Sequence, residues 1–129
     1  MSPRIDTLLE RARRSLERVS PQDLADEVSA GAVLVDIRPV ADRASDGELP
    51  GAIVIERNVL EWRFDPRSDA RIEQAAYDAR VIVLCQEGYT SSLAADALRS
   101  IGITRATDVI GGFAAWRAAG LPVAGTSTA

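Results

Sequence analysis

The sequence predicts an α/β domain with a mainly parallel sheet, and three observations support this fold class. The chain has 129 residues, which is the size of one domain. Short apolar runs alternate along it with segments of helical periodicity, as in folds built from strand and helix units. The apolar runs are continuous, which is typical of strands that are covered on both faces of a parallel sheet.

The first expected element is an amphipathic helix over residues 5–19, and we assign residues 1–19 as a helical extension of the domain. Its apolar residues recur at steps of three and four, as one face of a helix requires. It also carries four arginines, for which the simpler interpretation is a solvated helix face and the alternative is a specific anionic partner. The apolar positions are Ile5, Leu8, Leu9, Ala12, Leu16 and Val19, and the arginines are Arg11, Arg13, Arg14 and Arg18.

The main domain is expected to cover residues 20–124, followed by a flexible tail at 125–129. It opens with a helix that Ser20 caps, that has Pro21 in its first turn and that ends at Gly31. Apolar runs predict strands at 33–35, 52–55 and 81–84, and a last strand is expected at 107–110. Helical patterns lie at 59–62, 72–77 and 91–101, and a final helix follows the last strand and continues through Arg117.

The ionisable residues exclude many mechanisms, because all 15 basic residues are arginines and the chain has one cysteine and no histidine. Without lysine there is no Schiff base, and without histidine there is no Ser-His-Asp triad or Cys-His pair. One cysteine cannot form a disulfide within the chain or a usual zinc site. We therefore predict no metal and no cofactor, and Cys85 is the main reactive group that remains.

Charge and hydropathy give further expectations about partners and location. The net charge of −4 and the sequence pI near 4.8 do not favour a broad basic surface for nucleic acid. No apolar run approaches the roughly 20 residues that span a bilayer, so no membrane partner is expected. The first residues lack the pattern of a secretory signal, and the cytoplasm is the expected location.

Cys85 stands where an α/β fold usually places chemistry, directly after the most apolar run and shortly before the helix expected from Ser91. Backbone N–H groups at a helix start favour a negatively charged sulfur, which is the reactive form of a thiol. Gly88 permits the positive φ that a ring of N–H groups needs, and Thr90 and Ser91 add hydroxyls nearby. The alternative is a small buried core residue.

Four segments of the sequence resemble the successive signatures of the rhodanese family, over about residues 21–123. The resemblance implies a three-layer fold with a central five-stranded parallel sheet flanked by helices. It also implies that Cys85 accepts sulfane sulfur as a persulfide, with Gln86, Glu87, Gly88, Tyr89, Thr90 and Ser91 forming a cradle around it. The four segments are Val-Asp-Ile-Arg at 35–38, Gly-Glu-Leu-Pro-Gly-Ala at 47–52, the apolar run with its cysteine loop at 81–91, and Gly-Gly-Phe-Ala-Ala-Trp at 111–116.

The sequence departs from the family pattern at two positions. Glu48 replaces the usual histidine, and Thr90 stands where many single-domain members carry arginine. The loop therefore has no cation and one acid, Glu87. Glu87 either discourages dianionic donors or contacts a cationic acceptor, and the alternative is a solvated loop tip. An anionic donor would then need an arginine from elsewhere, and by resemblance Arg43 is the leading candidate, with a surface ion pair as its alternative.

Five residues are expected to support the loop rather than to contact a substrate. Asp36 and Arg38 form the family's Asp-x-Arg motif and are expected to brace loops through an ion pair. Gly111 and Gly112 would allow close packing of the last helix, and Trp116 would anchor the core. Tyr89 either lines the mouth of the pocket or is a surface aromatic without a chemical role.

The expected function is that of a rhodanese-like thiosulfate sulfurtransferase, in which a small anionic donor loads Cys85 and a thiol or cyanide accepts the sulfur. A protein acceptor is a further candidate. One alternative is a non-enzymatic interaction or regulatory module, and another is a persulfide relay between proteins. A cysteine phosphatase is disfavoured because its phosphate-gripping arginine would stand at the seventh position of the loop, which is Ser91.

Overall fold

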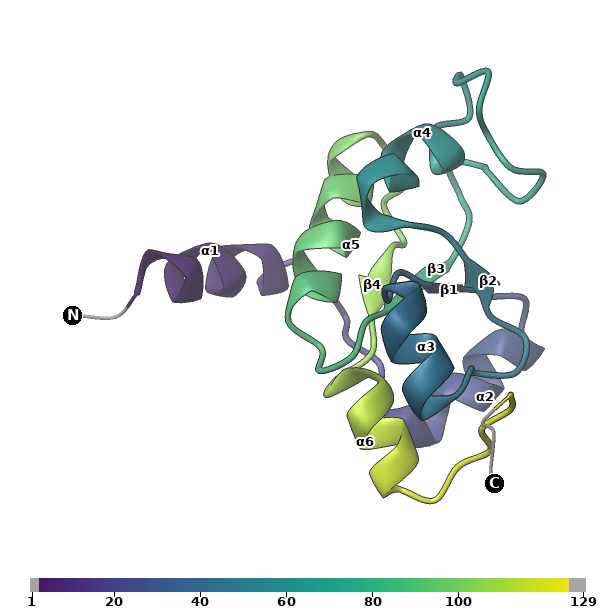
Figure 1. The fold of residues 1–129 in the computed structure, drawn as a ribbon. Coiled ribbons are helices and arrows are strands. Elements are labelled where there is room, and N and C mark those ends of the chain that lie inside the picture. Colours follow the sequence, from purple (N-terminus) through teal and green to yellow (C-terminus); the bar gives the residue numbers. More distant parts are fainter. Residues whose placement is uncertain (1–2, 126–129) are drawn as a thin grey trace.

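The computed structural model describes residues 3–125, and its centre is a parallel sheet of four strands (Figure 1). The spatial order of the strands is β2-β1-β3-β4. Val35 pairs with Ile53 on one side and with Val83 on the other, and Val83 pairs in turn with Asp108. The strands are β1 (Val33–Asp36), β2 (Ile53–Val54), β3 (Val81–Leu84) and β4 (Thr107–Asp108).

The sheet of the described residues has four strands, and the expected number of five is therefore wrong. At the free edge of β4, Val19 forms an isolated parallel bridge with Val109. Its N–H donates to the Asp108 carbonyl at 2.9 Å, and its carbonyl accepts from Ile110 N–H at 2.8 Å. Because α2 (Pro21–Ser29) begins two residues later, this pairing cannot lengthen into a strand.

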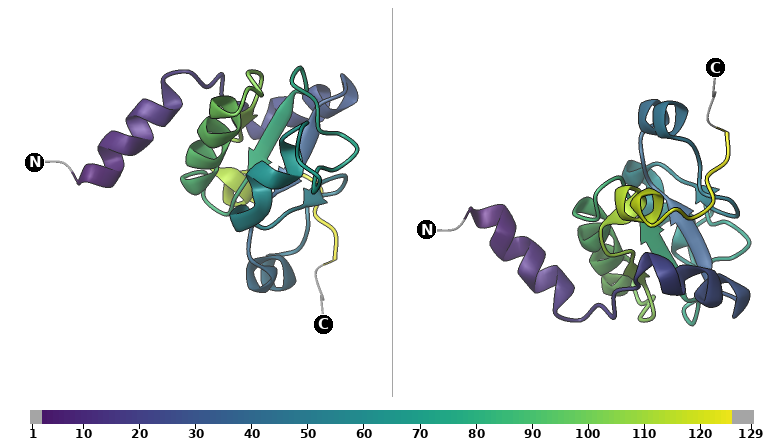
Figure 2. Two further views of the ribbon diagram at one scale, coloured as in Figure 1. Left: turned by 90° about the horizontal axis from the view of Figure 1, so that it is seen from above. Right: turned by 90° about the horizontal axis from the view of Figure 1, so that it is seen from below.

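Helices cover both faces of the sheet (Figures 1 and 2). On one face Val81 and Val83 pack with α4 (Leu60–Phe64) and α5 (Thr90–Ser100). On the other face Ile82 and Leu84 pack with α2 and α6 (Gly112–Ala118). Successive strand residues point to opposite faces, so burial on both sides requires the continuous apolar run that the sequence shows.

Two helix predictions differ from the structure. The N-terminal helix α1 (Arg4–Arg13) ends six residues before Val19, whose backbone pairs with the sheet instead. Residues 72–77 form turns, because Ile72 packs against the core and its N–H donates to the Arg63 carbonyl at 2.8 Å. Two further elements were not predicted, namely α3 (Val40–Asp46) and the 3₁₀ turn η1 (Arg57–Val59).

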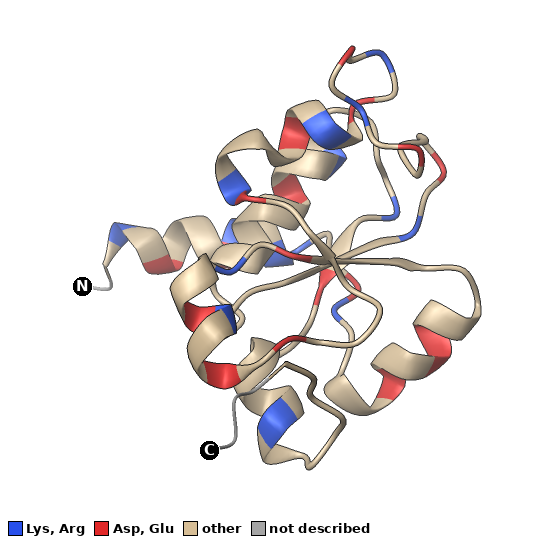
Figure 3. Ribbon diagram, turned by 45° about the vertical axis from the view of Figure 1, so that its right-hand side comes forward, with Lys and Arg blue, Asp and Glu red and all other residues tan. Residues whose placement is uncertain are grey.

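Helix α1 projects from the domain at its N-terminal end and contacts α5 nearer its C-terminal end (Figure 2). Ile5 and Leu8 are therefore exposed, whereas Ala12 is buried. Residues of both charge signs are interleaved over most of the fold, although α2 carries only acidic ones (Figure 3). Within residues 3–125 no helix has the length and apolar character needed to cross a bilayer. Most of the tail expected at 125–129 lies outside the described residues.

Candidate active site around Cys85

Cys85 lies directly after β3, and 4% of its surface is exposed. It borders a cavity of about 270 Å³ at the carboxyl end of the sheet. A larger cavity of about 450 Å³ lies apart from it, between Ser15, Arg80 and Arg105. Because Cys85 is the chain's one thiol, we take the smaller cavity as the candidate site. It is lined by Ile37, Arg38, Pro39, Asp42, Cys85, Gln86, Glu87, Tyr89 and Thr90.

Two backbone N–H groups converge on the sulfur of Cys85. Gly88 N lies 3.1 Å from Sγ, and Ser91 N, in the first turn of α5, lies 3.4 Å from it. Gly88 has a φ of +84°, a conformation that glycine adopts without strain. These donors favour a negatively charged sulfur. The Ser91 hydroxyl, in contrast to the sequence-based expectation, donates to Asp108 at 2.8 Å instead of adding to the cradle.

The start of α6 packs directly on the cysteine loop. Phe113 N–H donates to the Cys85 carbonyl at 2.9 Å, and Ala114 N–H donates to the Gln86 carbonyl at 2.9 Å. A Cβ atom on Gly112 would lie 2.4 Å from the Cys85 carbonyl oxygen and 2.7 Å from Gly88 N. Real Cβ atoms essentially never come so close, so only glycine fits at position 112 without a shift of the loop.

Gly88→Ala is expected to lower the free energy of unfolding by about 2–5 kcal/mol, because alanine adds both positive-φ strain and a steric clash. Its Cβ would lie 2.7 Å from Gly111 N. Gly51→Ala is the matched control, since Gly51 has a φ of +83° and open space around its Cβ position. Strain alone predicts about 1–2 kcal/mol there. Urea denaturation measures both, and equal losses would show that close packing against Gly111 contributes nothing.

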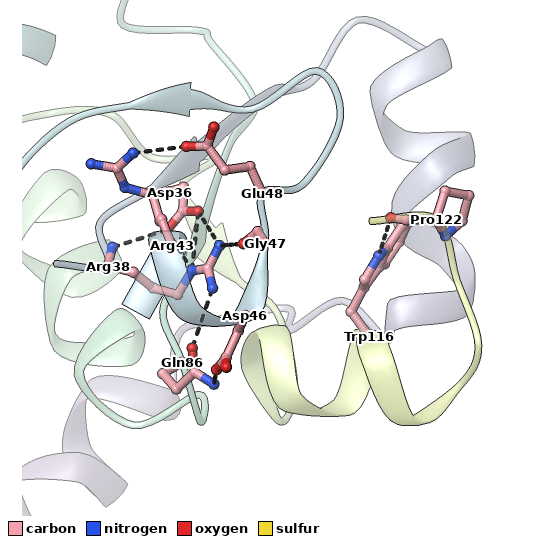
Figure 4. Close-up of polar contacts among 9 residues, drawn as sticks. All are labelled: Asp36, Arg38, Arg43, Asp46, Gly47, Glu48, Gln86, Trp116 and Pro122. Carbon is pink, nitrogen blue, oxygen red and sulfur yellow. Dashed lines mark hydrogen bonds and ion pairs between the residues drawn. The ribbon is translucent and has the colours of Figure 1, made fainter. Parts of the chain in front are cut away.

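Asp36 and Arg38 form a buried ion pair, 2.9 Å between Arg38 Nη2 and Asp36 Oδ2, with side chains 1% and 0% exposed (Figure 4). The guanidinium also donates to the Gly47 carbonyl at 2.8 Å and stacks on the Phe113 ring at 3.9 Å from its centroid. Its Nη1 donates to Gln86 Oε1 at 3.3 Å. The pair thus connects the ends of β1 and α3 with the cysteine loop and α6.

Gln86 is held between two elements rather than being free to meet a ligand. In addition to its contact with Arg38, its Nε2 donates to Asp46 Oδ2 at 2.8 Å (Figure 4). Asp46 is the last residue of α3, a helix that was not predicted from the sequence. The side chain of Gln86 therefore ties the first residue of the loop to α3.

Arg43 does not line the cavity at Cys85. Its Nη1 donates to Glu48 at 2.7 Å (Figure 4). Arg43 also borders a separate cavity with Val40 and Gly125. The structure thus shows the ion pair that was the alternative for Arg43. Trp116 also lies away from the thiol, buried in the core with its Nε1 donating to the Pro122 carbonyl at 2.7 Å.

The charges that line the cavity are mainly negative. Asp42 is half-buried and Glu87 is exposed, and both border the cavity. Within residues 3–125, the guanidinium that lines it is that of Arg38, which is already paired with Asp36. Tyr89 is 59% exposed and lies at the same cavity, with the Arg13 guanidinium 5.8 Å from its ring centroid.

The residues behind the loop were not predicted from the sequence. Arg13 and Arg18, assigned to a solvated helix face, both donate to the Gly88 carbonyl, at 2.8 and 3.0 Å. Asp108 is fully buried and accepts from Arg18, at 2.8 Å, and from Ser92 Oγ, at 2.7 Å. One signal was present in the sequence, because an acid in an expected buried strand needs a partner. Nothing in the sequence identified that partner as Arg18.

The known proteins that are similar to this chain agree with the family model that it matches. Residues 20–119 match the family model described as a rhodanese-like domain. The chain is 34% identical over 102 residues to thiosulfate sulfurtransferase GlpE of Ectopseudomonas mendocina, covering 79% of this chain and 85% of that protein. It is 31% identical over 115 residues to adenylyltransferase and sulfurtransferase MOCS3-1 of Zea mays. That match covers 89% of this chain but spans only 24% of the maize protein.

Solved structures agree with this assignment. A protein of unknown function from Rhodopseudomonas palustris, described as "Possible Tyrosine Phosphatase", matches with a TM-score of 0.84 and 31% identity, covering 95% of this chain and 96% of that one. The human single-domain sulfurtransferase TSTD1 matches with a TM-score of 0.68 and 27% identity, over 78% of this chain and 95% of that one. The chain therefore belongs to the rhodanese-like domain family.

Proposed function

We propose that this protein is a sulfurtransferase in which Cys85 carries sulfur as a persulfide. The observation that carries the proposal is the position of Cys85. It borders a cavity, and its Sγ accepts hydrogen bonds from the N–H groups of Gly88 and Ser91. A structural thiol needs neither a cavity nor donors for a negative charge. The similarity to GlpE and TSTD1, both named as sulfurtransferases, supports the same function.

The proposed reaction has two steps, here written with thiosulfate as donor. The thiolate of Cys85 attacks the outer sulfur of thiosulfate, an S–S bond forms to the protein, and sulfite leaves with the electron pair of the broken S–S bond. An acceptor such as cyanide then attacks the outer sulfur of the persulfide. A C–S bond forms, the protein S–S bond breaks, and the thiolate of Cys85 is regenerated as thiocyanate leaves.

The cavity itself gives a thiosulfate dianion little help. Asp42 and Glu87 border it, and the guanidinium of Arg38 is occupied by Asp36. Like charges in a partly shielded cavity repel one another, so a donor with less negative charge is favoured. A role for Arg43 in gripping the donor would require that it leave Glu48 and the separate cavity that it lines.

A persulfide relay between proteins is the second candidate. One observation favours it, namely that the matching region forms about a quarter of a larger maize protein named as an adenylyltransferase and sulfurtransferase. A non-enzymatic interaction module remains the third alternative, and Cys85 with its two N–H donors argues against it. We place the reaction in the cytoplasm, where a free thiol stays reduced.

A phosphatase is less well supported, although one similar structure is described as a candidate of that kind. Phosphoryl transfer needs fixed positive charge around the transferred group. The seventh loop residue is Ser91, whose hydroxyl donates to Asp108, and the guanidinium at the cavity is bound to Asp36. The loop can stabilise a singly charged sulfur better than a phosphate.

The test is intact-mass analysis after exposure to thiosulfate, mercaptopyruvate and a small-molecule persulfide in turn. We expect a gain of one sulfur atom that cyanide removes and that Cys85→Ser does not show. Loading by the persulfide alone would exclude thiosulfate and mercaptopyruvate as donors and would favour the relay, which receives its sulfur from a persulfide. If no donor adds sulfur, the sulfurtransferase proposal is wrong and the interaction module takes its place.

A further inference from the structure

Two arginines from the N-terminal segment bind one carbonyl of the cysteine loop. Arg13 Nη2 lies 2.8 Å from the Gly88 oxygen, and Arg18 Nη2 lies 3.0 Å from it. Arg13 ends α1, which packs beside α5 (Figure 1), and Arg18 lies in the link to α2. Both residues precede the region at 20–119 that matches the family, so this contact is an addition to the domain rather than part of its matched core.

The two guanidinium groups are fixed on their other sides. Arg18 Nε pairs with Asp108 Oδ1 at 2.8 Å, and Asp108 is fully buried. The same carboxylate accepts the hydroxyls of Ser91 and Ser92, at 2.8 and 2.7 Å. Arg13 Nε donates to the Ser92 hydroxyl at 3.0 Å. Every member of this network is thus satisfied, which gives the arginines one defined position.

The network has one net positive charge and lies behind the loop. The loop itself contains no cation. Two guanidinium groups and the single carboxylate of Asp108 are present, so one charge is not neutralised. Arg13 is the member without a carboxylate partner among these contacts, since it binds a carbonyl and a hydroxyl. The loop from Gln86 to Ser91 contains no cation and one acid.

The contact with the Gly88 carbonyl also sets the direction of the next N–H. In a trans peptide the C=O and the following N–H point in opposite directions, and the described chain has no cis peptide bond. With the Gly88 oxygen held by the arginines, the Tyr89 N–H points away from them, and Tyr89 borders the cavity at Cys85. Sγ of Cys85 already accepts from Gly88 and Ser91, so the Tyr89 N–H is left for a second sulfur attached to it.

We propose that Arg13 and Arg18 are positioning residues that hold the 88–89 peptide for the outer sulfur of the Cys85 persulfide. They do not touch the reacting atoms. They act through the peptide that they orient and polarise, and their net positive charge stabilises the negative charge that loading moves from Sγ to the outer sulfur. This inference rests on the proposed persulfide function, and it assigns to the N-terminal segment the positive charge that the loop lacks.

The experiment measures the ratio of thiosulfate to sulfite at which half of Cys85 carries the extra sulfur, by intact mass on the full chain. This equilibrium compares the loaded and unloaded folded protein, so a merely structural residue does not shift it. Arg13→Met is expected to raise the ratio roughly tenfold, as loss of one charge-assisted hydrogen bond to the loop predicts. Arg14→Met is the matched control, because Arg14 is exposed, adjacent and equal in charge.

A double variant removes the contact of Arg18 with the Gly88 carbonyl but leaves the net charge of the network unchanged. The double change Arg18→Gln with Asp108→Asn removes one charge of each sign, leaves no buried carboxylate without its partner, and is expected to raise the ratio less than Arg13→Met. If Arg13→Met and Arg14→Met give the wild-type ratio, the proposed role of Arg13 and Arg18 is wrong while the persulfide function stands. If neither thiosulfate, mercaptopyruvate nor the small-molecule persulfide loads the wild-type chain, both proposals fail together.

Discussion

Cys85→Ser is expected to reduce thiocyanate formation by about 10³-fold or more, because the attacking sulfur is removed while the rest of the site is kept. A serine hydroxyl at neutral pH is not ionised and forms no persulfide. It can still accept the N–H groups of Gly88 and Ser91 that now meet Sγ at 3.1 and 3.4 Å. The free energy of unfolding should therefore change by only about 1 kcal/mol.

Cys85→Ala provides the matching control for this result. It should be equally inactive but less stable, because the two N–H groups lose their acceptor inside a site where residue 85 is 4% exposed. An unsatisfied buried donor costs about 1–3 kcal/mol. Steady-state turnover and urea denaturation measure the two properties. Turnover by Cys85→Ser at the wild-type rate would show that the transferred sulfur is not bound at residue 85.

Arg38→Ala is expected to lower the free energy of unfolding by about 3–5 kcal/mol, because it leaves the buried carboxylate of Asp36 without a partner. Asp36 is 1% exposed, and the lost guanidinium also donates to the Gly47 carbonyl and stacks on Phe113. A loss of this size is a large part of the total stability of a domain, about 5–15 kcal/mol. Arg38→Lys should recover little, since an ammonium cannot make the forked contact or the stacking.

Arg57→Ala is the control for Arg38→Ala, because it also removes an arginine from an ion pair. Arg57 and Glu61 lie 2.7 Å apart with side chains 37% and 28% exposed. A solvated pair of this kind, four residues apart, contributes about 0.3–0.5 kcal/mol. Denaturant midpoints of the two variants under one set of conditions provide the comparison. Similar losses would mean that burial of the Asp36–Arg38 pair adds nothing to its effect on stability.

Parts of the site that depend on residues close together along the chain could be predicted from the sequence. The apolar run at 81–84 and Gly88 placed Cys85 at the end of a buried strand, before a helix whose N–H groups approach the sulfur. Arg43 could not be placed in the same way, because its side chain turns from the cavity to meet Glu48. The direction of a long side chain depends on which opposite charge the fold brings near it.

In the N-terminal segment, the helix could be predicted from the sequence, but its end and the contacts of its arginines could not. Its apolar spacing correctly indicated a helix, but the helix ends at Arg13, and Val19 pairs instead with Val109, 90 positions later in the chain. Arg11 and Arg14 are exposed as the solvated-face interpretation expected, whereas Arg13 and Arg18 are half-buried. Helical periodicity alone does not distinguish these two pairs of arginines.

The fold class, the position of Cys85 after a buried strand and the positive φ of Gly88 could all be predicted from the sequence, because apolar burial on both faces and positive φ leave local marks. Which arginines contact the loop depends on the tertiary structure. Arg13 and Gly88 are 75 positions apart and meet because α1 docks on α5. Charges attract over any separation along the chain, so their pairing is set by the packing of the elements that carry them.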